Sequence, residues 1–155
     1  MNLSTHFTLE EFTQSDTALR RGIDNSLPEE LMGNAISTCL LLERIRKFLS
    51  KKSGKDTPIE ITSGYRCPAL NMAVHSSSTS DHPKAFAADI KAPSFGTPYQ
   101  IAMALKDDID QLGIGQLIYE FGGWVHISYN MVNDQKNRVL TIDSKGIRQG
   151  IEGIR

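Results

Sequence analysis

The chain has 155 residues, of which 39% are hydrophobic and 23% are charged, values that are ordinary for a soluble globular protein. Its 17 basic and 18 acidic residues give a formal net charge of −1, so the composition excludes a strongly basic protein of the nucleic-acid-binding class. This length is typical of one domain with a sizeable core, and we expect a single domain over residues 1–155.

The N-terminus and the cysteines indicate where the protein is made. The first residues, MNLSTHFTLEEF, contain neither the basic segment nor the apolar segment of a secretory signal. The longest apolar run, CLLL, is too short to cross a bilayer, so no membrane insertion is expected. Two free thiols at Cys39 and Cys67 are the favoured interpretation, although one bridge between them stays open. We therefore expect synthesis in the cytoplasm without a signal peptide.

The N-terminal half is predicted to be mainly helical. Thr8 and Glu11 have the spacing of a capping box and predict a helix that begins in FTLEEF. Residues 16–25 are polar and are expected to be irregular. Residues 26–54 give the strongest helical signal, with Pro28 in the first turn and lysines near the end. The predicted apolar face of this helix comprises Leu31, Ala35, Thr38, Leu42, Ile45 and Leu49, with Cys39 beside it as a core residue.

The C-terminal half is predicted to combine strands with one helix. Residues 58–63 alternate in the manner of a strand, and residues 97–113 predict a helix. Residues 116–129 predict a hairpin, and residues 138–143 a further strand. A loosely ordered tail is expected from about residue 143 to 155. The whole pattern predicts an α+β domain, a mostly antiparallel sheet with helices packed on the outside.

Strand alternation brings polar side chains of the predicted hairpin to one face. If residues 121–123 close the turn, Glu120 lies opposite Trp124 and Ile118 lies opposite His126. Glu120 and His126 are then diagonal neighbours on the same face, within reach of a shared ligand.

Asp89 raises a separate question, because it lies in the apolar run FAADI. An unpaired buried carboxylate is costly, so its partner must be an arginine, a set of backbone N–H groups or a metal ion. His82 and His126 would complete a His-Asp-His set that suits zinc with water as the fourth ligand. Glu120 would then act as general base on that water. The spacing alone leaves these alternatives open.

Three motifs in order along the chain resemble one known family. They are SGYRCPALN at 63–71, SDHPKAFAADI at 80–90 and QLIYEFGGWVHISY at 116–129. Together with FTLEEFTQSDTALRRGIDNSLP near the N-terminus, they resemble the zinc D-alanyl-D-alanine carboxypeptidase family, whose fold is shared with the hedgehog domain. The N-terminal segment is similar to the compact branch associated with phages and prophages. The resemblance covers roughly residues 7–130 and implies a hedgehog/DD-peptidase-like fold.

The resemblance also implies a set of site residues. The family pattern S-x-H-x(6)-D falls on Ser80, His82 and Asp89, and the second family histidine falls on His126. Zinc, one ion, is therefore implied to bind His82, Asp89 and His126, and Ser80 is implied to contact substrate. The family arginine falls on Arg66, whose guanidinium suits a carboxylate or a developing oxyanion.

Three positions depart from the family pattern. The family often has glycine where this chain has His75 and Ala85. His75 is close to the site in sequence, but a solvent-facing loop histidine is the favoured interpretation. Many distant relatives carry the catalytic acid/base three residues before the last ligand, where this chain has Gly123. Glu120, six residues before His126, is the nearest substitute.

The resemblance implies a zinc metallopeptidase that hydrolyses D-Ala–D-Ala type bonds in peptidoglycan stem peptides or cross-links. Arg66 would orient the substrate, and Trp124 would either form a wall of the cleft or belong to the hairpin core. The expected partner is a peptidoglycan peptide, and a monomer is expected. Phage-type release, as for an endolysin, or incorporation into a virion would bring the enzyme to the cell wall. The alternative is a non-catalytic wall-binding or virion structural module that retains the fold.

Overall fold

The computed structural model describes residues 1–132 and 134–153, and its strands form one six-stranded sheet in the order β1-β2-β4-β3-β5-β6. Neighbouring strands are antiparallel, except that β3 and β5 are parallel. The strands are β1 (Glu60–Ser63), β2 (Ala87–Lys91), β3 (Gln116–Glu120), β4 (Trp124–Ser128), β5 (Val139–Asp143) and β6 (Gly146–Gln149). This arrangement confirms the predicted α+β class with a mostly antiparallel sheet.

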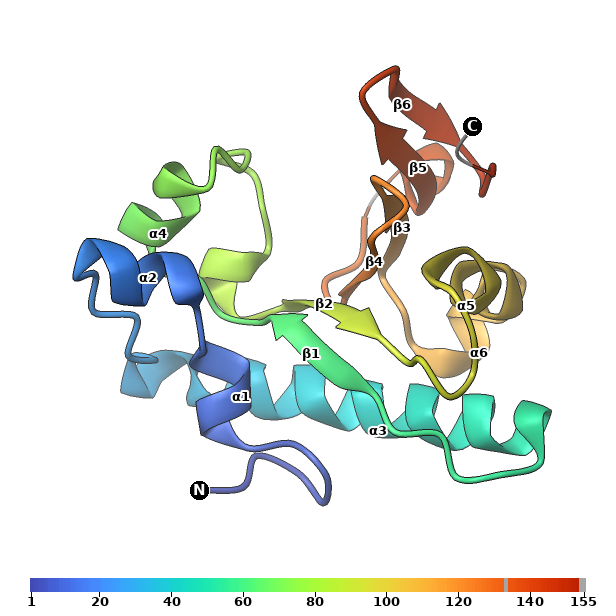
Figure 1. Cartoon of the computed structure of the whole chain (residues 1–155), viewed down its shortest axis with the longest axis horizontal. Coiled ribbons are helices and arrows are strands. Elements are labelled where there is room, and N and C mark those ends of the chain that lie inside the picture. The colour runs from blue at the N-terminus through green and yellow to red at the C-terminus, as the bar shows by residue number, and fades with distance from the viewer. Residues whose placement is uncertain (133, 154–155) are drawn as a thin grey trace.

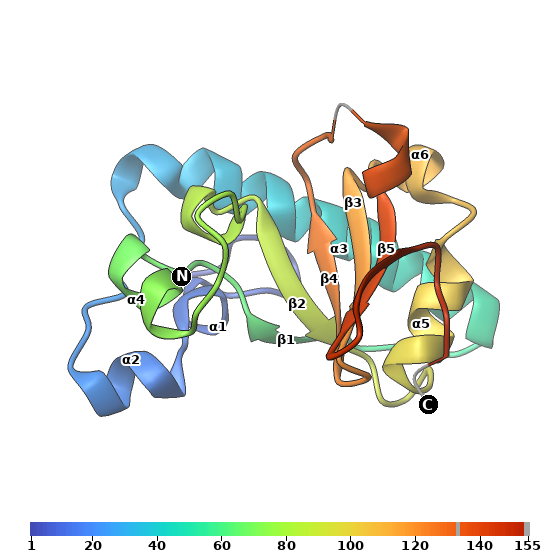
Figure 2. The ribbon, with the colours of Figure 1, turned by 90° about the horizontal axis from the view of Figure 1, so that it is seen from above.

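Helices pack around this sheet. They are α1 (Leu9–Thr13), α2 (Asp16–Arg21), α3 (Met32–Ser53), α4 (Pro68–Ala73), α5 (Pro98–Leu105) and α6 (Ile109–Leu112), with 3-10 turns η1 (Glu29–Leu31), η2 (His82–Lys84) and η3 (Gln135–Asn137). Figures 1 and 2 both place α2 and α4 at one end of the molecule and α5 with the β5–β6 hairpin at the other. Within the described part of the chain, no helix has both the length and the apolar composition to cross a bilayer.

The core lies between α3, α5 and the facing side of β2, β3 and β4. The buried face of α3 comprises Ala35, Thr38, Cys39, Leu41, Leu42, Ile45 and Leu49. This set confirms the predicted apolar face, although Leu31 precedes α3 and is only half-buried. Cys39 is a free thiol with no exposed surface, and burial, together with the charges of Glu43 and Glu11, raises its pKa to about 12.

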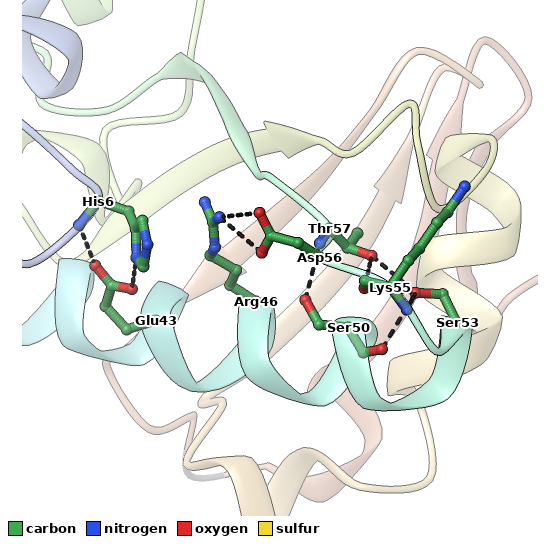
Figure 3. Close-up of polar contacts among 8 residues, drawn as sticks. All are labelled: His6, Glu43, Arg46, Ser50, Ser53, Lys55, Asp56 and Thr57. Carbon is green, nitrogen blue, oxygen red and sulfur yellow. Dashed lines mark hydrogen bonds and ion pairs between the residues drawn. The ribbon is translucent and has the colours of Figure 1, made fainter.

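Polar contacts attach neighbouring loops to α3 (Figure 3). The ring nitrogen Nδ1 of His6 lies 2.7 Å from Glu43 Oε2. Arg46 donates from Nη2 to both carboxylate oxygens of Asp56, each at 2.9 Å. These contacts hold the N-terminal loop and the α3–β1 connection against the helix, so that β1 enters the sheet at a defined position.

The N-terminal capping box is confirmed, but the segment after it differs from the prediction. Residues 16–25 were expected to be irregular, whereas residues 16–21 form α2. The Ser15 hydroxyl accepts a hydrogen bond from the Ala18 N–H at 3.1 Å, and Gly22 ends the helix at φ 65°. The caps therefore support a short helix despite its polar composition.

The predicted helix over 97–113 is divided in two. Its Thr97 cap and its Gly113 stop are both present, but α5 ends at Leu105 and α6 begins at Ile109. The hydrophilic residues 106–108 turn the chain between them, and this change of direction keeps Leu112 in the core. The sequence pattern did not predict this turn, because the helical spacing of apolar residues continues across residues 106–108.

The expected loose tail from residue 143 also differs, because residues 146–149 form β6 and pair antiparallel with β5. The Arg148 guanidinium donates to both carboxylate oxygens of Asp143, at 2.9 and 2.7 Å. This bidentate pair closes the hairpin and holds the pKa of Asp143 at about 2. Residues 154 and 155, the end of the predicted tail, lie outside the described residues.

Candidate metal and catalytic site

The register of β2, β4 and β3 places the candidate site on one face of the sheet. Glu120 pairs with Trp124 and Ile118 with His126, as the hairpin turn predicted. Asp89 on β2 pairs directly with His126 on β4. Since side chains alternate along each strand, Asp89, His126 and Glu120 all point to the same side.

The loop before β2 delivers His82 to the same point. The Ser80 hydroxyl accepts a hydrogen bond from the His82 N–H at 3.2 Å and so closes the turn. The ring Nδ1 of His82 lies 2.6 Å from the Gly64 carbonyl oxygen. A carbonyl oxygen can only accept, so Nδ1 carries a proton, and Nε2 is the ring atom left to donate to Asp89 or, once deprotonated, to bind a metal ion. That Nε2 lies 3.3 Å from Asp89 Oδ1, in the orientation typical of a metal-binding histidine with its second nitrogen anchored.

Three donor atoms converge at this position. His126 Nδ1 lies 3.1 Å from Asp89 Oδ1, and one ligand atom from each of His82, Asp89 and His126 lies within 4.8 Å of the other two. Two donors about 2.1 Å from one tetrahedral ion are separated by about 3.4 Å, close to the observed spacings. All three residues are buried, so few alternative partners from water are available. The donor set and its spacing therefore fit a divalent metal such as zinc.

The other histidines and the cysteines lie outside this cluster. His6 pairs with Glu43 on α3, and His75 lies on the loop that borders the cleft. Cys67 is a free thiol whose sulfur accepts a hydrogen bond from the Leu70 N–H at 3.4 Å and caps α4. Among the described residues, no second group of three such side chains comes this close together.

Electrostatics at the cluster keep Asp89 ionised. Burial would raise the pKa of Asp89, but the charge of His82 and hydrogen bonds from both histidines outweigh it and hold the pKa well below its usual range. Burial lowers the pKa of His82. The pKa of His126 is raised although burial opposes this, because Asp89 and Glu120 favour its charged form. A buried carboxylate that stays ionised favours a cation at this position.

Glu120 lies beside the cluster without belonging to it. Its Oε1 is 3.8 Å from His126 Nδ1, and its side chain is 20% exposed. Burial raises the pKa of Glu120, and Asp89 adds to this, whereas His126 and Arg66 oppose it. A carboxylate with a raised pKa next to a metal-binding cluster has the properties of a general base.

Arg66 is positioned by a residue that the sequence analysis missed. Asn25 donates to the Tyr65 carbonyl oxygen at 2.9 Å and accepts from the Cys67 N–H at 2.8 Å. Asn25 thus clamps the backbone on both sides of Arg66, whose own N–H donates to the His82 carbonyl oxygen at 3.3 Å. Asn25 is a single asparagine in a loop far from Arg66 in sequence, and no spacing rule connects the two residues, so the sequence alone did not reveal its role.

The guanidinium of Arg66 lines the same cleft as the cluster. Its Nη2 donates to the Ser76 hydroxyl at 3.4 Å, while its buried Nε has no hydrogen-bond partner among the described residues. Burial lowers the pKa of Arg66, although Asp89 and Glu120 favour its charged form. A desolvated and incompletely paired guanidinium is suited to bind an oxygen of a ligand.

Asp81 is a second residue that the sequence analysis missed. Its carboxylate accepts from the Ser128 hydroxyl at 2.7 Å and from the Asn130 side-chain amide at 3.2 Å. These bonds tie the turn that carries His82 to the end of β4, two residues after His126. The sequence offered one signal for Asp81, namely an acidic residue directly before the predicted ligand His82.

The cleft above the cluster has a volume of about 630 Å³ and contains Ser80, Glu120 and Trp124 in its lining. Trp124 therefore forms part of the cleft wall, and its ring centroid lies 5.8 Å from that of Phe121. The indole N–H of Trp124 is buried and has no hydrogen-bond partner among the described residues. The Ser80 hydroxyl is engaged with the His82 N–H, so its first role in this structure is to shape the turn.

Backbone strain is concentrated around the cleft. In the described part of the chain, the non-glycine residues with positive φ are His75 at 58°, Ala85 at 60° and Phe121 at 52°. The first two are positions where the resemblance leads us to expect glycine, and the observed φ values explain that expectation. Such conformations persist where the surrounding structure holds them, often at functional sites.

Comparisons with known proteins agree with this geometry. The family model described as Peptidase M15 matches residues 5–128, which include the cluster, Arg66 and Glu120. No curated protein matches the chain.

Proposed function

This chain belongs to the peptidase M15 family of metallopeptidases, and we propose that it hydrolyses D-Ala–D-Ala type bonds in peptidoglycan stem peptides or cross-links, with one zinc ion. The observation that carries the proposal is the convergence of His82, Asp89 and His126 on one point in a cleft that also contains Glu120 and Arg66. The histidine and carboxylate donors fit zinc, and three protein ligands leave a coordination position free for chemistry.

Zinc bound by these residues would supply a Lewis acid that polarises the scissile carbonyl and lowers the pKa of the attacking water toward about 7. Glu120 accepts the proton that the water loses as its oxygen bonds to the carbonyl carbon. Glu120 then gives this proton to the leaving amine as the C–N bond breaks, so the same carboxyl acts as base and then as acid. Burial raises the pKa of Glu120 above that of a free glutamate, which favours its role as proton acceptor.

Arg66 binds a substrate oxygen in this mechanism. Its guanidinium borders the cleft and retains an unpaired buried N–H, so it can stabilise negative charge that develops on the carbonyl oxygen or hold a substrate carboxylate. Trp124 forms a wall that orients the peptide, and Ser80 maintains the turn of His82. The roles of Arg66, Trp124 and Ser80 are all part of the proposed mechanism.

The alternative of a non-catalytic wall-binding or virion module is not favoured. Such a module has no need of an acid/base carboxylate next to the cluster, whereas Glu120 lies 3.8 Å from His126 Nδ1. Membership of the phage-associated branch, phage-type release and a virion location all stay predictions, as does the monomeric state.

The proposal is tested by incubating the protein with purified peptidoglycan and with peptides that end in D-Ala–D-Ala. We expect release of amino groups that stops on chelation and returns with zinc. Glu120→Gln should lower kcat by about 10²–10⁴-fold while zinc binding is retained, because only the proton transfer is lost. Mass analysis of the released muropeptides identifies the bond.

The matched control is Glu60→Gln, an exposed carboxyl on β1 that lies away from the cleft and should leave activity unchanged. Hydrolysis that persists after chelation, or that Glu120→Gln leaves intact, would refute the mechanism. A muropeptide pattern without any newly cleaved peptide bond would refute the substrate class.

A further inference from the structure

One wall of the cleft is a polar loop that the proposed mechanism uses only through Ser80. We call it the rim loop, namely residues 74–80, VHSSSTS, which connect α4 to η2 (Figure 1). Every residue of the rim loop except Ser78 lines the cleft. Five of its seven residues carry a hydroxyl group, one is a histidine and none is acidic. This wall therefore offers hydrogen-bond donors to a ligand and carries no negative charge.

The rim loop is held in place by Asn71, a buried residue of α4. The Asn71 backbone carbonyl accepts from the Ser76 N–H at 3.0 Å, and its side-chain amide donates to the Ser77 carbonyl oxygen at 3.1 Å. The His75 N–H donates to the Met72 carbonyl oxygen at 3.0 Å. These bonds keep His75 at φ 58°, where a glycine would be free of strain. A strained side chain at the edge of a cleft points to a function for that side chain.

The imidazole ring of His75 is available to a ligand. His75 is exposed and lines the cleft. The rings of the other three histidines are paired with Glu43, Gly64 and Asp89, whereas the ring of His75 has no hydrogen-bond partner among the described residues. A histidine ring carries at least one N–H group, so His75 can donate a hydrogen bond to an oxygen of a bound molecule.

A second donor lies next to His75 in the rim loop. The Ser76 hydroxyl oxygen accepts from Arg66 Nη2 at 3.4 Å, which leaves the Ser76 O–H to donate in turn. A hydroxyl that accepts from a cation is a better donor, because hydrogen bonds in a chain polarise one another. The buried Nε of Arg66 also lacks a partner within the described part of the chain. Two neighbouring side chains and a guanidinium thus favour a negatively charged ligand group on this wall.

The acidic side chains that line the cleft are engaged outside the rim loop. Asp89 belongs to the metal-binding cluster, and Glu120 lies beside it. Asp81 accepts hydrogen bonds from Ser128 and Asn130 at the end of β4. A carboxylate held by the rim loop therefore meets donors there and no carboxylate of the loop itself.

We infer that the rim loop binds a free side-chain carboxylate of the substrate, and that His75 is the residue that determines this preference. The inference rests on the proposed peptidase function and adds the chemistry of the substrate residue before D-Ala–D-Ala. The terminal carboxylate is common to all stem peptides that end in D-Ala–D-Ala, so only a side-chain carboxyl can distinguish among them. Hydrogen bonds to an ionised carboxylate are stronger than those to a neutral amide, so the acidic substrate is preferred.

Two synthetic peptides test this inference. Both end in D-Ala–D-Ala, and the residue immediately before it is glutamate in one and glutamine in the other, which differ in charge but hardly in shape. We expect kcat/KM to be about tenfold higher for the glutamate peptide, mainly through KM. His75→Gly removes the ring without straining the backbone and should reduce the difference to within about twofold.

A charge reversal and a neighbouring residue sharpen the test. Aspartate tolerates positive φ better than most residues, so His75→Asp should fold and should invert the preference, because like charges repel. Ser78→Gly is the matched control on the same loop, since Ser78 is exposed and does not line the cleft. This control should retain the preference for the glutamate peptide.

The outcomes separate this inference from the proposed function. Equal rates on the two peptides, or a preference that survives both His75 substitutions, would overturn the carboxylate site and leave the peptidase function standing. An equal loss of preference in Ser78→Gly would also overturn it, because the shape of the loop would then be responsible.

If neither peptide is hydrolysed, the proposed function fails, and the carboxylate site is then tested by binding. The fluorescence of Trp124, the one tryptophan in the chain, reports binding because this residue lines the cleft. Tighter binding of the glutamate peptide that His75→Gly removes would support the site, whereas equal affinities of the two peptides would overturn it.

Discussion

The two faces of β2, β4 and β3 differ in what they contribute to the molecule, although neighbouring residues of the same strands form them. One face packs into the core through Ala88, Ile90, Leu117, Tyr119, Val125 and Ile127. The other face borders the cleft through Asp89, Ile118, Glu120, Trp124 and His126. Because successive side chains of a strand point to opposite faces, residues that stabilise the core alternate with residues that line the cleft within the same five-residue strands. Substitutions on the two faces should therefore have different consequences.

The largest effect is expected on the cleft face, at the His82–Asp89–His126 cluster. Asp89→Ala should weaken zinc binding by more than about 100-fold, because even residues that merely orient metal ligands contribute 10–100-fold. Activity should fall to background, and zinc should no longer raise the melting temperature, as we expect it to do for the unmodified protein. Calorimetric titration with zinc and thermal melts measure both effects.

His6→Ala and His75→Ala are the matched controls, because neither histidine belongs to the cluster. Loss of zinc binding in either control would show that the ligand assignment is wrong.

The second-largest effect is a loss of stability, expected for a substitution on the core face. Ile127→Ala should lower the free energy of unfolding by about 2–5 kcal/mol, since Ile127 is completely buried and the substitution leaves a cavity. Activity per folded molecule should stay within about twofold of the original. Urea denaturation gives the stability, and active-site titration with zinc gives the folded fraction.

Ile147→Ala provides the matched isoleucine control for stability, because that side chain is exposed. Its free energy of unfolding should change by less than about 0.5 kcal/mol. An equal loss in the two variants would show that the core does not lie where this structure has it.

A third effect depends on pH and is expected on the cleft face, at Glu120. Burial raises the pKa of Glu120 above the 4.5 of an unperturbed glutamate, so the folded protein loses stability as pH rises above 4.5 and the buried carboxyl ionises. Glu120→Gln removes this cost and should stabilise the metal-free protein at pH 7, with no gain at pH 4. Thermal melts in chelator at the two pH values measure the difference.

A lower melting temperature of Glu120→Gln at pH 7 would show instead that the ionised carboxylate stabilises the fold. Ile127→Ala should destabilise at both pH values, since no titrating group is removed.

The smallest effect is expected at the rim of the cleft. His75 has φ 58°, a conformation that costs a non-glycine residue about 1–2 kcal/mol. His75→Gly should relieve this strain, but glycine also adds freedom to the unfolded chain, so the net gain should stay within about 1 kcal/mol. Zinc affinity should not change, and denaturation by urea provides the measurement. A clear loss of stability would mean that the histidine side chain makes a contact that outweighs its backbone strain.

The hairpin register illustrates why part of the site could be predicted. A three-residue turn at 121–123 and strict alternation determine which residues pair, and the pairs Glu120–Trp124 and Ile118–His126 followed directly. His82 and Asp89 carried no comparable geometric signal. Their chemistry suggested a His-Asp-His set with His126, the resemblance of motifs implied the same three ligands, and the structure then showed that their donor atoms converge.

Other elements show why the remainder could not be predicted. The polar helix α2 depends on its caps at Ser15 and Gly22, whose joint effect outweighed a composition typical of a loop. The strand β6 depends on pairing with β5 and on the Asp143–Arg148 ion pair, so its short sequence gave no independent signal. Local sequence patterns do not reveal which strand or which charged side chain a segment will pair with.

The sequence by itself determined the class of fold, the apolar face of the long helix, the hairpin register and a short list of chemically able side chains, because each of these depends on local periodicity or turn length. The tertiary structure alone decided which of those side chains meet. It brought the His82 ring to hydrogen-bond distance of the Gly64 carbonyl oxygen, and it bonded the Asn25 side chain to the backbone on both sides of Arg66. Long-range contacts of this kind arise only when the core is packed, since their partners are distant in the chain and are brought together by burial of the residues between them.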